Sequence, residues 1–431
     1  MTILTDTMTT DLQPRPAKTI IADMREPILS DLQKGALAAA AAHPIVVSAQ
    51  NVLAGACTET GLTDFGDDGF RVRLDLWCDA VNAQTDLTDL ARAGTYGDMV
   101  RFASNRLRVE DAIAKHPEIL DIVIDRPLIV AGLPRSGTTY LQNFLGADDR
   151  LRSLPYWEAL RPVPSRPEEN GDPDTDPRHA AAAEAWAQMD AMLPYIKAVH
   201  PFDPDHISED IELQCIDFGS YYLEWGVPND AWTDYYWSTD QTPVYRYMKR
   251  VLQVLTWFKG PNRWLLKCPQ HMEQLPALRT VFPDATFVIN HRDPIGSIQS
   301  AITSIGYSSR IRVDKVDPEA IAAYWIDRYE KLLHACVRDR GVIPACQSED
   351  VYFHELIADP MAVVGRIYAK AGLPIDDRLR GRMAAFLDEN QRGKHGALDN
   401  DLRRDFGLDP AEVRQRYQFY FDRFPVQVEV Q

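Results

Sequence analysis

The sequence has few cysteines, no excess of positive charge and no long uninterrupted apolar run. Only six of its 431 residues are cysteine and none of them form a Cys-x-x-Cys pair, which argues against a zinc site and against a disulfide framework. The formal net charge of −17 excludes binding to nucleic acid or to an anionic membrane by bulk electrostatics. The most apolar stretch, residues 36–56, is interrupted by His43, Pro44 and later polar residues, so we predict neither a membrane span nor a signal peptide.

The small number and scattered positions of the cysteines indicate a protein of a reducing compartment, so we expect a cytoplasmic location. What the chain does contain is ample material for a core, because 45% of its residues are hydrophobic and 10% are aromatic. Its length suits one large α/β domain with extensions, or two domains. An acidic protein that binds an anionic ligand needs a local cluster of cations, and three segments of the chain supply one.

The most informative segment is residues 127–141, which read Pro-Leu-Ile-Val-Ala-Gly-Leu-Pro-Arg-Ser-Gly-Thr-Thr-Tyr-Leu. Residues 128–131 have the length and composition of a buried strand, and the chain then turns at 132–134. Gly137 opens a segment with helical periodicity. A strand, a tight turn and a helix start gather free backbone N–H groups at the positive end of a helix dipole, so this segment predicts a phosphate-binding loop.

This loop differs from the ATP-binding Walker A loop at one decisive position. Gly132 and Gly137 have the Walker spacing, but Thr138 stands where that motif has its lysine, the residue that reaches the β- and γ-phosphates. The positive charge is at Arg135 instead. The missing lysine argues against an ATPase, a GTPase or an ATP-dependent kinase. A P-loop nucleotide or small-molecule kinase and a non-catalytic nucleotide-binding protein are kept as the less favoured alternatives.

A second segment predicts a strand–helix–strand–helix unit. The expected strands are 264–266 and 286–290, and the expected helices are 272–281 and about 295–304. This order predicts a parallel sheet, in which functional groups gather at the carboxyl ends of the strands. Arg135, Lys267 and Arg292 each follow such an end. We therefore expect three cations from distant parts of the chain to meet along one rim of the sheet.

At this point the sequence resembles a family. Gly-x-Pro-Arg-Ser-Gly-Thr-Thr is similar to the 5′-phosphosulfate loop of sulfotransferases that use 3′-phosphoadenosine 5′-phosphosulfate (PAPS), and the large bacterial branch fits best. The resemblance covers roughly residues 126–410 and implies a P-loop-like fold of three layers. It also implies in-line sulfuryl transfer to a hydroxyl without a metal, with 3′,5′-adenosine bisphosphate as product. The implied ligands of the 5′-phosphosulfate are Arg135, Ser136, Gly137, Thr138 and Thr139.

The resemblance also implies a site for the 3′-phosphate. In the family an arginine after the later strand and a serine eight residues on hold this group, and Arg292 and Ser300 have that spacing. A late basic loop closes over the same phosphate, and Arg392, Gly393 and Lys394 match it. An arginine fork suits phosphate oxygens, and a glycine lets backbone approach an anion.

For catalysis the resemblance implies two stabilising cations and one base. Arg135 stands where cytosolic members of the family have lysine, so Lys267 carries more of the proton donation to the leaving group, because an arginine stays protonated. His271 is the preferred base, since the cytosolic enzymes have theirs just after the matching lysine, although Pro269 occupies the strictly equivalent position. Glu209 is the second candidate, by similarity to tyrosine sulfotransferases. Further candidates from the same stretch are His200, His206 and Glu212.

We predict a loose tail at 1–19, a mostly helical extension at 20–125 and a sulfotransferase domain at 126–431. Within that domain, residues 160–260 are expected to form an acceptor pocket and residues 388–431 to close over the donor. Fifteen aromatic residues between 186 and 258 suit a small apolar or ring-bearing acceptor, although most are expected to be ordinary packing residues. The sequence leaves open the acceptor, the lining aromatics and the oligomeric state, with a homodimer among the options.

Overall fold

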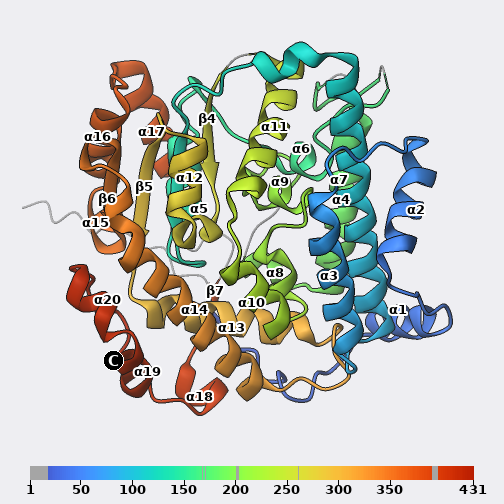
Figure 1. The fold of residues 1–431 in the computed structure, drawn as a ribbon. Helices are drawn as coiled ribbons and strands as arrows, with labels where there is room; N and C mark the ends of the chain where they lie inside the picture. The colour runs from blue at the N-terminus through green and yellow to red at the C-terminus, as the bar shows by residue number, and fades with distance from the viewer. Residues whose placement is uncertain (1–17, 167, 170, 200–202, 261, 391–396) are drawn as a thin grey trace, which may run out of the picture.

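The computed structural model describes residues 18–166, 168–169, 171–199, 203–260, 262–390 and 397–431. Its centre is a parallel sheet of five strands in the order β3-β4-β2-β5-β6 (Figure 1). These strands are β2 (Leu128–Gly132), β3 (Leu151–Arg152), β4 (Arg263–Lys267), β5 (Thr286–His291) and β6 (Ser348–Tyr352). A second, two-stranded parallel sheet pairs β1 (Lys18–Thr19) with β7 (Ala397–Leu398) and so joins distant parts of the chain.

The central strand β2 is apolar throughout because both of its faces are covered. Leu128 and Val130 belong to a core cluster with the helices at residues 138–145, 360–371 and 377–389, whereas Ile129 and Ala131 point into a cluster with the helices at residues 242–259, 275–281, 294–309 and 318–339. Alternate side chains of a strand point to opposite faces, so a strand between two helical layers reads as an unbroken apolar run. This arrangement is the three-layer α/β fold that the sequence predicted.

Twenty helices surround the two sheets in the described part of the chain. The first four are α1 (Asp31–Ala41), α2 (Ala49–Thr60), α3 (Arg71–Ala83) and α4 (Asp89–Lys115). Between β2 and β5 follow α5 (Thr138–Leu145), α6 (Tyr156–Leu160), α7 (Pro177–Met192), α8 (Ile196–Val199), α9 (Ile211–Cys215), α10 (Asp230–Ser238), α11 (Thr242–Lys259) and α12 (Leu275–Val281). The rest are α13 (Pro294–Ser309), α14 (Pro318–Asp339), α15 (Phe353–Ala358), α16 (Pro360–Ala371), α17 (Asp377–Glu389), α18 (Leu402–Phe406), α19 (Pro410–Arg416) and α20 (Gln418–Arg423).

The N-terminal helices pack beside the sheet domain through an aromatic cluster. The Trp77 ring of α3 makes edge-on contacts with Phe102 of α4, Phe218 and Trp232 of α10, at centroid distances of 6.2, 5.5 and 5.8 Å. Arg106 of α4 reinforces this contact with an ion pair of 2.7 Å to Asp217. Figure 1 shows α2, α3 and α4 on the side of the molecule opposite α15, α16 and α17.

Local structure departs from the sequence prediction at 18–19, where β1 forms at the end of the expected loose tail, and in the segment before β5. The helix expected over 272–281 is a 3₁₀ helix, η4 (Pro269–Glu273), followed by the shorter α12. Pro276 follows the first residue of α12, and a proline lacks the N–H that a continuous helix needs there. In the described segments, no helix combines the length and apolarity that crossing a membrane requires.

Candidate active site

The loop between β2 and α5 is a tight turn stabilised by its own backbone and by the neighbouring strand. Both N–H and hydroxyl of Ser136 donate to the carbonyl of Leu133, at 3.2 and 2.6 Å. From the end of β5, the Asn290 amide donates to the Ser136 carbonyl at 2.7 Å. Arg135 and Gly137 adopt positive φ values of 64° and 92°, and no side chain caps the start of α5. The first N–H groups of this helix therefore face a position suited to an anion.

Arg135 is the cation of this loop, and it has no carboxylate partner among the residues that the structure describes. Its Nε donates to the Ser300 hydroxyl of α13 at 3.2 Å. Burial lowers the pKa of the Arg135 guanidinium, and the positive charge of Arg292 lowers this pKa further, while Tyr329 and the more distant carboxylate of Glu209 partly oppose the shift. An arginine remains protonated even so, so the site holds a desolvated positive charge that an anion would neutralise.

Lys267 approaches the same loop from the end of β4. Its side chain is only 1% exposed, and its ammonium group donates to the Thr139 hydroxyl of α5 at 3.2 Å. It also forms an ion pair with the carboxylate of Glu209. Burial, together with the charge of the Lys267 ammonium, lowers the pKa of His206 to about 4, so this imidazole is neutral near pH 7.

Arg292 follows β5 and completes the row of cations. Its Nη1 donates to the Arg135 carbonyl at 2.6 Å, which ties the ends of β2 and β5 together. Its Nε and Nη2 both bind the carboxylate of Glu429, each at 2.8 Å, and the guanidinium stacks 4.0 Å from the Phe353 ring centre. Arg135, Lys267 and Arg292 thus lie along one rim of the sheet, as the strand ends predicted.

His271, the expected base, is fully buried in η4 with both ring nitrogens engaged. Its Nε2 is 2.8 Å from the Asp210 carboxylate, and its Nδ1 is 3.0 Å from the Tyr245 hydroxyl. The N–H of Asp210 in turn donates to the Lys267 carbonyl at 3.2 Å. His271 therefore supports the segment that carries Glu209, whereas Glu209 itself reaches the rim with 23% of its side chain exposed.

Several predicted site residues lie outside the described part of the chain. These are Arg392, Gly393, Lys394 and the competing base candidate His200. Sequence reasoning missed Asn290 and Glu429. Asn290 had a usable signal, because it is a polar residue at the end of a buried strand, but Glu429 had none, since it comes from the last residues of the chain.

Many of the aromatic side chains between 186 and 258 are packing residues. Tyr221, Trp232, Tyr236 and Tyr245 are each at most 1% exposed, and Trp232 and Tyr236 belong to the cluster around Trp77. The sequence analysis predicts such a packing role for most of the fifteen aromatic residues in this stretch.

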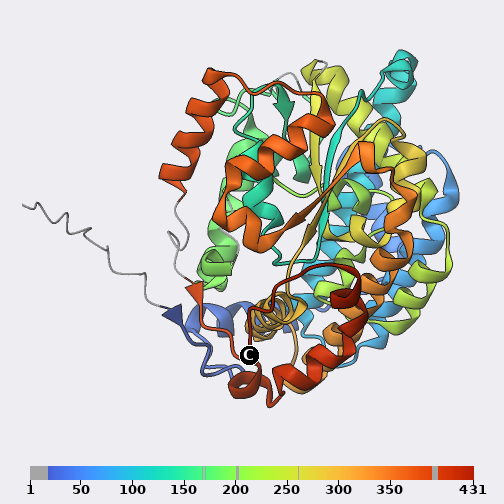
Figure 2. The same ribbon diagram turned by 90° about the vertical axis from the view of Figure 1, so that its left-hand side faces the viewer.

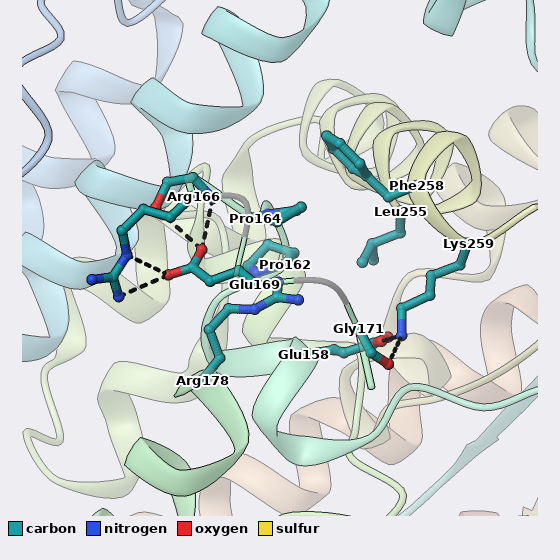
Figure 3. Close-up of a pocket in the computed structure, with 11 residues that line it drawn as sticks. Glu158, Pro162, Pro164, Arg166, Glu169, Gly171, Arg178, Leu255, Phe258 and Lys259 are labelled. Atoms are coloured by element: carbon teal, nitrogen blue, oxygen red, sulfur yellow. Dashed lines mark hydrogen bonds and ion pairs between the residues drawn. The ribbon is translucent and has the colours of Figure 1, made fainter. Parts of the chain in front are cut away.

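A cavity of about 430 Å³ lies between α6, α7 and the end of α11 (Figure 3). Its walls include Leu255, Phe258 and Lys259 at the end of α11, shortly before β4 begins. The Lys259 ammonium pairs with Glu158 at 2.6 Å, and Arg166 pairs with Glu169 at 3.1 Å. These charges satisfy one another, so the cavity has no cation comparable to Arg135.

Comparisons with known proteins agree with this geometry. A family model described as the sulfotransferase family matches residues 127–377, more than half of the chain. The structure resembles the crystal structure of sulfotransferase STF9 from Mycobacterium avium, with 29% identity and a TM-score of 0.80, over 90% of this chain and 99% of that one. It also resembles STF1 from Mycobacterium tuberculosis H37Rv, with 29% identity and a TM-score of 0.76, over 86% and 98% of the two chains.

Two curated relatives are similar over a shorter stretch. Both are omega-hydroxy-beta-dihydromenaquinone-9 sulfotransferases named Stf3, from Mycobacterium bovis and Mycobacterium tuberculosis, and each is 23% identical over 276 residues. The match covers 58% of this chain and 64% of each relative. With its parallel sheet, its loop after β2 and the family match, this chain belongs to the sulfotransferase family.

Proposed function

We propose that this protein transfers the sulfuryl group of PAPS to a hydroxyl group of a small acceptor. The observation that supports this most directly is the half-buried Arg135 guanidinium, which forms no ion pair with a carboxylate in the described residues and stands before the uncapped start of α5. A desolvated, unpaired charge is costly unless a ligand neutralises it. An anionic group bound at this loop would do so.

The residues of the rim suit both ends of this donor. Backbone N–H groups of Gly137, Thr138 and Thr139, together with Arg135, suit the 5′-phosphosulfate. Ser136 stays part of the proposed loop, and its N–H and hydroxyl shape the turn by donating to the Leu133 carbonyl. Arg292 and Ser300 suit the 3′-phosphate, and the proposal extends to Arg392, Gly393 and Lys394 beyond the described residues. The donor would supply the sulfuryl group and the leaving group. Lys267 and Arg135 would stabilise the negative charge that develops on the bridging oxygen.

We assign the general base to Glu209 rather than to His271. Glu209 lies on the rim beside Lys267, and its carboxylate is partly exposed. Both nitrogens of His271 are hydrogen-bonded to buried partners, so His271 is better placed to orient the segment that carries Glu209. A base must reach the acceptor hydroxyl directly or through one water, which favours the exposed group.

We infer the class of acceptor from the relatives and from the many aromatic residues between 186 and 258. The curated relatives are named as sulfotransferases of an omega-hydroxy dihydromenaquinone. Such an acceptor carries its hydroxyl group on an apolar, ring-bearing molecule. We propose an acceptor of the same chemical class for this chain. A cytoplasmic location is part of the proposal, and its support is that all six cysteines are unpaired.

A ligand-protection experiment followed by an activity assay tests this function. The thermal transition of the full chain is measured with 3′,5′-adenosine bisphosphate and, separately, with ATP and Mg²⁺. The bisphosphate should raise the transition temperature, because at 100 times its Kd a ligand stabilises the native state by about 2.7 kcal/mol. Protection by ATP and Mg²⁺ alone would instead identify a kinase.

The Arg135→Ala variant completes this test. It should lose most of the protection by the bisphosphate and the sulfation of a simple phenol from PAPS. The matched control is Arg150→Ala, because Arg150 pairs with Asp148 near α5 and lies away from the rim. Equal protection of the wild type and Arg135→Ala would contradict the proposed donor site.

A further inference from the structure

The last residues of the chain run back to the donor rim. Residues 425–431, here called the C-terminal strap, follow α20 and end beside the start of α13 (Figure 2). The Asp293 carboxylate accepts hydrogen bonds from the N–H groups of Glu429 and Val430, at 2.8 and 3.4 Å. Arg414 of α19 donates to the Val430 carbonyl. The strap is therefore anchored through its backbone at the residue that follows Arg292.

The anchored backbone delivers the Glu429 side chain to Arg292. The carboxylate binds the Nε and Nη2 edge of the guanidinium with two hydrogen bonds of 2.8 Å. The remaining Nη1 donates to the Arg135 carbonyl, so each nitrogen of Arg292 has an acceptor. A Cβ built at Gly296, in the first turn of α13, would lie 3.6 Å from both Arg292 Nη2 and Glu429 Oε2. The ion pair thus lies directly over that turn.

This arrangement reproduces the way a phosphate binds arginine. Carboxylates and phosphates both accept two parallel N–H bonds from one guanidinium edge. We propose that the Glu429 carboxylate occupies the subsite of the donor's 3′-phosphate and competes with that phosphate for Arg292. This inference rests on the proposed function, because it takes Arg292 as the ligand of the 3′-phosphate.

The exposure of the pair permits such an exchange. The Arg292 side chain is 15% exposed and that of Glu429 is 28% exposed, so the carboxylate can swing into solvent without opening the core. The backbone anchor on Asp293 does not involve the Glu429 side chain and can persist. Glu429 then lowers the preference of the site for nucleotides with a 3′-phosphate, because these must displace it, whereas nucleotides without one leave it in place.

The test is calorimetric titration of the full chain with two nucleotides, 3′,5′-adenosine bisphosphate and 5′-AMP. In Glu429→Gln the bisphosphate should bind about fivefold more tightly, because a partly exposed ion pair that it no longer has to break is worth at most ~1 kcal/mol. The affinity for 5′-AMP should change by less than about twofold, since 5′-AMP lacks the competing phosphate. Asp422→Asn is the matched control, because it removes one negative charge from α20, where Asp422 contacts Gln418.

Three outcomes separate the inference from the function. Tighter binding of the bisphosphate alone, in Glu429→Gln and in Glu429→Ala, supports the competition. An unchanged or weaker bisphosphate affinity in both variants, with wild-type binding intact, means that Glu429 only orients Arg292, and overturns the inference while the function stands. Absence of bisphosphate binding in a wild-type chain with a normal thermal transition overturns the donor site and the inference together.

Discussion

The three cations of the rim differ in whether a carboxylate of the same chain pairs with them. Lys267 and Arg292 each bind a carboxylate of the same chain, Glu209 and Glu429, whereas Arg135 has only the Ser300 hydroxyl as a side-chain partner in the described segments. A bound donor can therefore neutralise Arg135 without breaking an internal ion pair. We infer that Arg135 contributes most to the first capture of the anion.

Substitutions of Glu209 and His271 should have different effects on turnover, and comparing them tests which residue is the base. Glu209→Gln should lower kcat by about 10²- to 10⁴-fold, the usual contribution of a general base, while affinity for 3′,5′-adenosine bisphosphate persists. His271→Asn should lower activity only in proportion to its loss of folded protein, because it removes a support of the segment at 209–210. Single-turnover sulfation and thermal unfolding measure both variants. The reverse pattern would return the base to His271.

At the scale of elements, the start of α5 depends on a glycine. Gly137 has φ of 92°, and a Cβ there would approach the Phe353 ring to 2.9 Å. Gly137→Ala should destabilise the fold by at least ~1–2 kcal/mol, the cost of a left-handed conformation for a residue with a side chain, and should weaken bisphosphate binding because the loop must shift. Urea unfolding and calorimetric titration measure the two effects.

The control for this substitution is a glycine within a helix. A Cβ at Gly94 of α4 would meet nothing within 4 Å, so Gly94→Ala should leave binding unchanged and stabilise the helix by up to ~1 kcal/mol. If Gly137→Ala behaved like Gly94→Ala, the strained turn would have no part in holding the donor.

At the scale of the whole molecule, the N-terminal helices share a core with the segment between the donor motifs. Trp77→Ala removes the ring that contacts Phe102, Phe218 and Trp232, and should cost ~3–5 kcal/mol. Scanning calorimetry should show one transition, moved to lower temperature. Val72→Ala on the same helix, at a residue 55% exposed, should change stability by no more than ~0.5 kcal/mol. The division of the chain into residues 20–125 and 126–431 stays a prediction. Two separate unfolding transitions, of which Trp77→Ala moves only one, would support this division.

The sequence by itself determined three of the five strands of the central sheet and the cationic rim, whereas β3, β6 and the strand order came from the structure. The apolar runs at 128–131, 264–266 and 286–290 predicted strands because a buried parallel strand is apolar on both faces. The carboxyl ends of those strands then placed Arg135, Lys267 and Arg292 together without knowledge of any contact. Such signals are local in the chain, so they survive in the sequence alone.

Only the tertiary structure decided which groups pair with those cations. Glu209 and Glu429 meet Lys267 and Arg292 across 58 and 137 residues of chain, and the hydrogen bonds of His271 come from residues 61 and 26 positions away. No periodicity or motif records such separations, because they result from how helices and the C-terminal strap close over the sheet. The contacts on which we base the proposed role of Glu209 and the proposed competition at Arg292 are therefore visible only in the folded chain.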